Sequence, residues 1–207
     1  TRIKGNIVKH HWHEEVELLY FSGGEFCLEV NMERFHISEE CFYFINPGEL
    51  HSINVEKNGG CVENAVVFHM DMLNSSYSLD QIQTNLIQPV QNGSIQFPRC
   101  LRKDEPAFEQ VRTAYEEIQN AFSGSAYRGD YYDGEAVTDD ITRQLFIKSA
   151  LLRILAVLSA NNLFEVTEKN HDRWIETIKT TLTYIQENYK EKIYIRDLAG
   201  LIGMNEQ

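Results

Sequence analysis

Short apolar runs, separated by turn-forming residues, fill the first 70 positions of the chain. Val, Ile, Phe and Tyr favour strands, whereas the intervening Gly, Asn and Pro favour tight turns. The pattern predicts strands at residues 16–21, 26–30, 34–37, 41–45, 52–55 and 62–70. Many short strands of this kind indicate an antiparallel barrel or sandwich, and a small barrel leaves room for one small ligand.

Beyond the strands, apolar residues recur every three or four positions, which is the period of a helix. An acidic, Pro-containing segment at 104–106 begins the first predicted helix, which ends at Gly124. The longest predicted helix covers 136–163, and its apolar residues form more than a single stripe. One side can face the barrel and the other a partner subunit, with Leu151 and Leu155 as candidate dimerisation residues; an ordinary core helix fits the pattern equally well.

The remaining segments complete the predicted organisation. A short helix at 78–86 and a strand at 95–98 are predicted before the helical region, and two further helices, 172–189 and 195–202, after it. The polar stretch 165–171 is the best domain boundary. The predicted divisions are a barrel of residues 1–100, a helical dimerisation region of residues 101–164 and a C-terminal segment of residues 165–207.

Composition narrows the classes of function. The 207 residues carry a net charge of −12, which argues against a polyanion gripped by the whole surface. Residues 171–207 hold five basic and six acidic groups, so any DNA contact is expected there. No apolar run reaches the roughly 18 residues of a membrane span, and four cysteines without Cys-x-x-Cys spacing indicate reduced thiols in a cytoplasm. Because the sequence begins without Met, we expect it to be part of a longer chain.

Two histidines and a glutamate near the start of the chain form the main candidate site. Side chains alternate between the faces of a strand, so His11, His13 and Glu17 are expected to point the same way. A Pro-Gly turn at 47–48 then leads to His51, which can face them from a neighbouring strand. Imidazole and carboxylate together suit a divalent metal such as Zn, Fe, Mn or Ni, but the same groups can hydrogen-bond an organic effector directly.

This spacing resembles a known motif. The segment from Gly5 to Gly24, with its two histidines and Glu17, resembles the first motif of the cupin barrels, and Pro47, Gly48 and His51 resemble the second. The resemblance implies a jelly-roll barrel. In metal-binding cupins, the corresponding set of His11, His13, Glu17 and His51 supplies the metal ligands.

The C-terminal segment TLTYIQENYKEKIYIRDLAGLIGMNEQ carries a second resemblance. It is similar to the start of the AraC-type DNA-binding domain, where a helix ending near an Asn-Tyr pair (188–189) leads to a short helix with Asp197, Leu198 and Ala199. The turn glycine of that family corresponds to Gly203. The resemblance implies a helix-turn-helix domain truncated at the start of its recognition helix, preceded by a cupin-like effector domain and dimerising helices.

The sequence therefore predicts a mainly β, cupin-like N-terminal barrel followed by helices, α+β overall, with a truncated all-α tail. We expect the ligand-sensing and dimerisation region of a cytoplasmic AraC-type transcription regulator rather than an enzyme. Its partners would be a small-molecule effector such as a sugar, a second copy of the chain, and DNA through the complete C-terminal domain. The sequence shows no nucleophile elbow, phosphate loop or zincin motif, so the remaining alternative is a metal-dependent cupin isomerase or dioxygenase.

Overall fold

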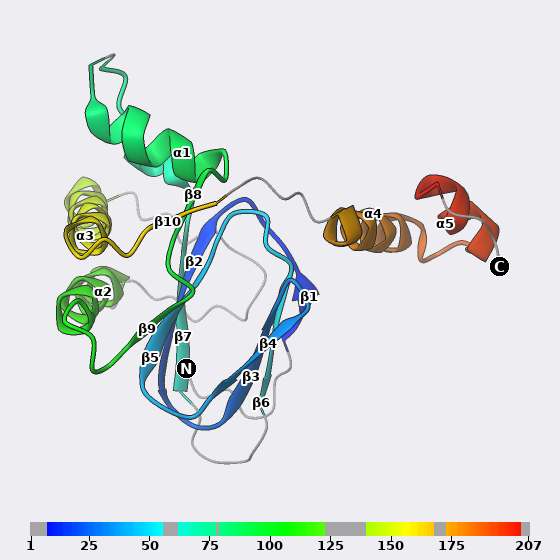
Figure 1. Ribbon diagram of the computed structural model, residues 1–207, viewed down its shortest axis with the longest axis horizontal. Coiled ribbons are helices and arrows are strands. Elements are labelled where there is room, and N and C mark those ends of the chain that lie inside the picture. The colour runs from blue at the N-terminus through cyan, green and yellow to red at the C-terminus, as the bar shows by residue number, and fades with distance from the viewer. Residues whose placement is uncertain (1–7, 56–61, 78, 123–139, 168–172, 204–207) are drawn as a thin grey trace.

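The computed structural model describes residues 8–55, 62–77, 79–122, 140–167 and 173–203. The barrel strands are β1 (Val8–His11), β2 (Val16–Gly23), β3 (Phe26–Val30), β4 (Glu33–Ile37), β5 (Cys41–Ile45), β6 (His51–Val55), β7 (Val62–Phe68) and β9 (Cys100–Arg102). They form two antiparallel sheets that face each other, in the orders β1-β6-β3-β4 and β7-β2-β5-β9 (Figure 1). This jelly-roll-like cupin barrel, followed by helices, confirms the predicted α+β fold class.

Strand β5 is apolar at every position and β2 at most of its positions, because both faces of their sheet are covered. They pair with Leu18 opposite Phe44 and Leu19 opposite Tyr43. Leu19 and Tyr43 belong to the core between the two sheets, whereas Leu18 and Phe44 belong to the core under the helices. Successive residues of a strand face opposite ways, so a strand buried on both sides shows little polar alternation.

Helices α2 (Phe108–Phe122) and α3 (Ile141–Ala160) cover the outer face of this sheet (Figure 1). The carboxylate of Asp140 accepts hydrogen bonds from the backbone N–H groups of Thr142 (2.9 Å) and Arg143 (3.4 Å) and so caps α3. Both predicted helices are therefore present, with later starts than predicted; residues 136–139 lie outside the described part of the chain.

The connection between barrel and helices differs from the prediction. It contains a 3-10 turn, η1 (Met70–Leu73), and a π-helical turn, η2 (Gln83–Ile87), that runs into the short helix α1 (Gln88–Gln91). Pro89 is tolerated because it occupies the first turn of α1. The strand predicted at 95–98 is β8 (Ile95–Gln96), which pairs with β10 (Glu165–Val166) instead of joining the barrel. Strand β9, which the sequence pattern did not reveal, is the strand that completes the barrel sheet.

The last two predicted helices are present as α4 (Arg173–Asn188) and α5 (Ile195–Leu201). They lie on the opposite side of the barrel from α2 and α3 (Figure 1). Gly203, which follows the C-cap residue Ile202 of α5, has a φ of +66°, a conformation that favours glycine at a helix end. Among the described residues, none of the helices has the length and apolar character that crossing a bilayer demands.

Candidate functional site

The four predicted site residues come together, but by a different route from the one the sequence suggested. His11 ends β1 and lies directly opposite His51, the first residue of β6. Glu17 lies on β2, which belongs to the facing sheet, and His13 lies in the connection between β1 and β2. The expectation of a single strand with one shared face is therefore wrong, because the chain crosses from one sheet to the other between His11 and Glu17.

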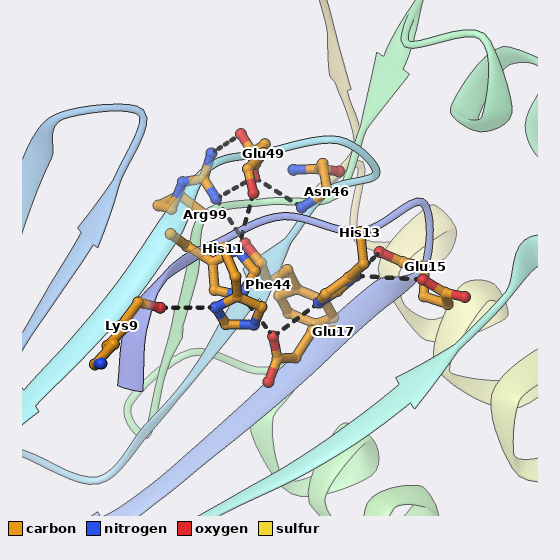
Figure 2. A network of polar contacts seen from close by, with 10 residues as sticks. Lys9, His11, His13, Glu15, Glu17, Phe44, Asn46, Glu49 and Arg99 are labelled. Carbon is orange, nitrogen blue, oxygen red and sulfur yellow. Dashed lines mark hydrogen bonds and ion pairs between the residues drawn. The ribbon is translucent and has the colours of Figure 1, made fainter. Parts of the chain in front are cut away.

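Figure 2 shows the side chains of His11, His13 and Glu17 pointing toward one another. One ligand atom from each of His11, His13, Glu17 and His51 lies within 4.8 Å of the other three. The Oε2 atom of Glu17 is 2.9 Å from Nε2 of His51 and 3.3 Å from Nε2 of His13. The rings of His11 and His51 have centroids 4.2 Å apart. Glu17 and His51 are buried, whereas His11 and His13 are partly exposed, so solvent reaches the group from one side.

Backbone carbonyl groups fix the orientation of all three imidazoles. Nδ1 donates to the carbonyl of Lys9 in His11 (2.9 Å), of Glu15 in His13 (3.1 Å) and of Glu49 in His51 (2.8 Å). A carbonyl oxygen can only accept, so each Nδ1 carries the hydrogen and each neutral ring presents a lone pair at Nε2. While all three rings are neutral, their Nε2 lone pairs meet the Glu17 carboxylate without a donor; a protonated His13 can donate from Nε2 to Glu17 Oε2, 3.3 Å away.

The lack of a hydrogen-bond donor is clearest at the buried Nε2 atom of His51. It makes no hydrogen bond within the described part of the chain, although Glu17 Oε2 is only 2.9 Å away, because the contact does not have the direction of a hydrogen bond. A lone pair facing a carboxylate at this distance is unfavourable unless a positive charge is shared between them. Protons or a metal cation can supply that charge.

Electrostatics within the group point the same way. Burial alone would raise the pKa of Glu17, but the contacts with His13 and His51 outweigh burial and hold it at about 2. Burial lowers the pKa of His13, yet the Glu17 carboxylate more than compensates and raises it overall. Burial and the neighbouring His51 lower the pKa of His11. The carboxylate thus stays charged at neutral pH and attracts positive charge to one point.

The residues fit a divalent cation. Three imidazole nitrogens and one carboxylate suit Zn, Fe, Mn or Ni. In metal sites the second ring nitrogen of each histidine ligand is usually held by a carbonyl or carboxylate, and here all three Nδ1 atoms are held in this way. His11, His13, Glu17 and His51 would hold the ion, which would neutralise the carboxylate and present positive charge to oxygen atoms of a ligand.

The turn at residues 46–49, which the sequence analysis did not assign to the site, holds two of its histidines in place. The backbone N–H of Gly48 donates to the carbonyl of His13 (2.8 Å), and Glu49 supplies the carbonyl that orients His51. The Glu49 carboxylate accepts from the backbone N–H of Asn46 (2.7 Å) and pairs with Arg99, which precedes β9. Asn46-Pro47-Gly48 could be recognised in the sequence as a turn, but the pairing of Glu49 with Arg99 spans 50 positions and leaves no local signal.

A cleft of about 800 Å³ lies on the other side of this turn. Residues 46–49 and Trp12 line it from the barrel, and Lys179, Thr183 and Tyr184 line it from α4. The middle of the barrel, by contrast, is filled by apolar side chains of both sheets. Space for a ligand therefore lies at the barrel end, beside residues 46–49 that contact His13 and His51, although none of the four site residues lines the cleft itself.

The remaining predicted functional residues do not join this site. Leu151 and Leu155 are 1% and 3% exposed and pack in the core under the helices, so their side chains are not available to a partner subunit. Asp197, Leu198 and Ala199 lie on α5, which buries none of its residues, and Gly203 follows it.

Comparisons with known proteins give one family match. The model of the AraC-like ligand binding domain matches residues 3–127. No curated protein sequence matches the chain. Among solved structures, ToxT from Vibrio cholerae bound to (E)-4-(8-methylnaphthalen-1-yl)but-3-enoic acid is 9% identical, with 99% of this chain and 69% of that chain covered and a TM-score of 0.43.

Two further structures are similar. Unsaturated fatty acid-bound ToxT from V. cholerae is 10% identical, with coverages of 98% and 66% and a TM-score of 0.41. KdgF from Halomonas sp. is 18% identical, with coverages of 34% and 67% and a TM-score of 0.29. Because all three TM-scores lie below 0.5, these likenesses support no inference about the ligand or the activity of this chain.

Proposed function

Because the chain belongs to the family of AraC-like ligand-binding domains, we propose that it is the effector-sensing region of an AraC-type transcription regulator. The observation that carries the proposal is the meeting of three Nε2 lone pairs and the Glu17 carboxylate beside the cleft under α4. The carboxylate and the nitrogen lone pairs attract a cation or hydrogen-bond donors, and solvent reaches the group. It is therefore a binding centre for a cation, or for an effector that donates hydrogen bonds.

The sensing step would depend on the turn at residues 46–49. On one side the turn is hydrogen-bonded to His13 and His51; on the other, Lys179 Nζ of α4 lies 3.7 Å from the position that a Cβ of Gly48 would occupy. An effector that binds better to one arrangement of this turn and α4 shifts the population toward that arrangement. The amide and hydroxyl groups around the cleft, together with Trp12, suit a small polar effector such as a sugar.

Dimerisation would use a surface of α3 other than the predicted leucines. Ile141, Leu145 and Leu152 are 72%, 63% and 43% exposed and lie near one another on the helix, since they are separated by four and seven residues. Phe146, beside them, is also exposed. Clustered apolar side chains on a surface commonly mark a protein interface.

DNA recognition would begin with α4 and α5. Their lengths and the short connection between them are in keeping with the first helices of a helix-turn-helix domain, and the recognition helix would then follow Gly203. Because that helix would begin only near the last residues of this sequence, gel shifts with residues 1–207 are expected to show no sequence-specific binding. Tight binding to a particular operator by this fragment would contradict the assignment.

The binding centre can be tested with Zn²⁺ as a probe. Calorimetric titration of the chelator-treated protein is expected to give one site per chain, and His13→Ala should weaken it about 100-fold or more. His69→Ala is the matched control, because this partly exposed histidine lies outside the group and contacts Asp71. Equal Zn²⁺ affinity in the wild type and His13→Ala would contradict a cation site at these residues.

A metal-dependent enzyme is the second candidate, and the same four ligand groups are the observation that favours it. Thermal-shift screening of sugars and other small polar compounds, followed by NMR of each binding compound after prolonged incubation, separates the two. A compound that binds and remains unchanged supports the sensor. Steady conversion that is lost in His13→Ala would establish the enzyme instead.

A further inference from the structure

Two cysteines and a tyrosine form a second chemical group at the other end of β5. Glu17 lies opposite Ile45, the last residue of β5, whereas Cys41 is its first. Cys41, Tyr43 and Cys100 all belong to the apolar core between the two sheets or pack against it. In the sequence the cysteines are far apart, with no sign that any two of them meet.

Strand pairing brings the two thiols together. In the β5–β9 pair, Tyr43 lies opposite Cys100 and Cys41 lies opposite Arg102. The two cysteines are therefore diagonal neighbours, offset by two positions, and side chains offset by two positions share a face of the sheet. Cys41 is buried and Cys100 is partly exposed, so small molecules in solvent reach Cys100 first.

The surroundings make Cys100 the more reactive of the two. Its contact with the Cys41 thiol lowers its pKa, burial opposes this, and the Tyr43 hydroxyl and Arg102 lower the pKa further, to about 7. The same contact with Cys100, together with burial, raises the pKa of Cys41. A partly exposed thiolate beside a second thiol is the arrangement found in cysteines that sense oxidants.

We propose that Cys100 is a peroxide-reactive thiol and that Cys41 resolves its oxidised form into an intramolecular disulfide. The Cys100 thiolate attacks one oxygen of hydrogen peroxide; the O–O bond breaks, hydroxide leaves and takes up a proton, and Cys100 becomes a sulfenic acid. Cys41 then loses its proton and attacks the Cys100 sulfur, so that the S–O bond breaks and water leaves. Overall, two thiols and one peroxide give one disulfide and two waters.

Oxidation of Cys100 makes it easier for Cys41 to lose its proton and form the disulfide. The negative charge on Cys100 is one reason that Cys41 holds its proton, and that charge is gone once Cys100 is a neutral sulfenic acid. Diagonal positions are farther apart than directly opposite ones, so the bridge has to draw β5 and β9 together. We therefore expect a disulfide that dithiothreitol reduces easily.

The test is to treat the protein with hydrogen peroxide, alkylate the remaining thiols and map the cysteines by mass spectrometry. Trypsin places Cys41 in peptide 35–57 and Cys100 in peptide 100–102, and it leaves Cys27 and Cys61 in two other peptides. The expected product links 35–57 to 100–102 and disappears on reduction. Peroxide treatment that leaves both thiols free, or oxidises Cys100 without the link, would overturn the proposal.

Variants separate the two roles. Cys41→Ser should stop the reaction at the sulfenic acid, which dimedone traps on Cys100, and Cys100→Ser should abolish both products. Cys27→Ser, on β3 of the other sheet, is the matched control and should still form the link. The rate of peroxide consumption should rise about fivefold to tenfold between about pH 6 and about pH 8 and then level off, following a pKa of about 7. A rate that keeps rising like that of an ordinary cysteine would contradict the proposal.

Discussion

The orientation of the three imidazoles is set by the backbone rather than by contacts among the rings. Each Nδ1 is engaged by a carbonyl group, from Lys9, Glu15 or Glu49, so no ring can turn its protonated nitrogen toward Glu17 without losing a hydrogen bond. A buried polar group left without its partner costs about 1–3 kcal/mol. The arrangement is therefore preorganised for a positive charge that arrives from outside.

Glu17 gives the site a measurable pH dependence in the metal-free protein. Its pKa falls from an ordinary value of 4.5 to about 2 in the fold, so its contribution to stability is present above pH 4.5 and is lost as the pH falls toward 2. Between about pH 5 and about pH 3 the free energy of unfolding should fall by about 2 kcal/mol more in the wild type than in Glu17→Gln. Urea titrations at a series of pH values measure this; identical pH dependence in the two proteins would contradict the inferred charge contacts.

The sequence predicted that the four residues meet, and they do, but for an incorrect reason. The odd spacing of His11, His13 and Glu17 suggested one strand with one polar face. Each residue in fact belongs to a different part of the chain, namely β1, the connection and β2. Tertiary crossing between sheets cannot be read from local periodicity, and neither can the pairing of Glu49 with Arg99.

At the scale of elements, the turn between β5 and β6 connects the site to α4. Gly48 has a φ of +76°, so any side chain there is strained by the cost of left-handed backbone. Gly48→Ala should therefore lower the free energy of unfolding by about 1–2 kcal/mol and also weaken Zn²⁺ binding, because the turn donates to His13. Gly200→Ala is the control: its Cβ meets nothing within 4 Å and it lies inside α5, so no loss is expected.

Helix α3 illustrates where sequence pattern succeeds and where it stops. The pattern correctly predicted a helix too apolar for a single stripe. It could not tell which apolar positions face the barrel and α2, and so it selected Leu151 and Leu155, which are buried. The exposed apolar residues could be separated from the buried ones only with the packing partner known.

The two sides of α3 should respond differently to substitution. Leu151→Ala removes buried side chain and should cost about 2–4 kcal/mol of stability, whereas Leu145→Asp, on the exposed side, should change stability by less than about 0.5 kcal/mol. Sedimentation should nevertheless show that Leu145→Asp dissociates a dimer that the wild type forms at micromolar concentrations. If the wild type is strictly monomeric under these conditions, the proposed dimer is wrong.

At the scale of the whole molecule, the two helical layers occupy opposite sides of the barrel. Helices α2 and α3 are packed on one sheet through a continuous apolar core. Helix α4, on the other side (Figure 1), faces the barrel end across a cleft lined by both polar and apolar residues. An element held by few buried apolar contacts separates from its neighbours at a lower free-energy cost than one packed in an apolar core. We therefore expect the barrel and α2–α3 to move little, and α4 to be the element whose position a bound ligand changes.

Amide hydrogen exchange with and without Zn²⁺ tests this account most directly. If the imidazole group is a binding centre that communicates with α4, Zn²⁺ should slow exchange in residues 10–17, in the turn at 46–51 and also in α4, while α2 and α3 remain unchanged. His13→Ala should remove all of these differences together. Slower exchange at the histidines with no change in the turn or α4, or no change anywhere, would contradict the account.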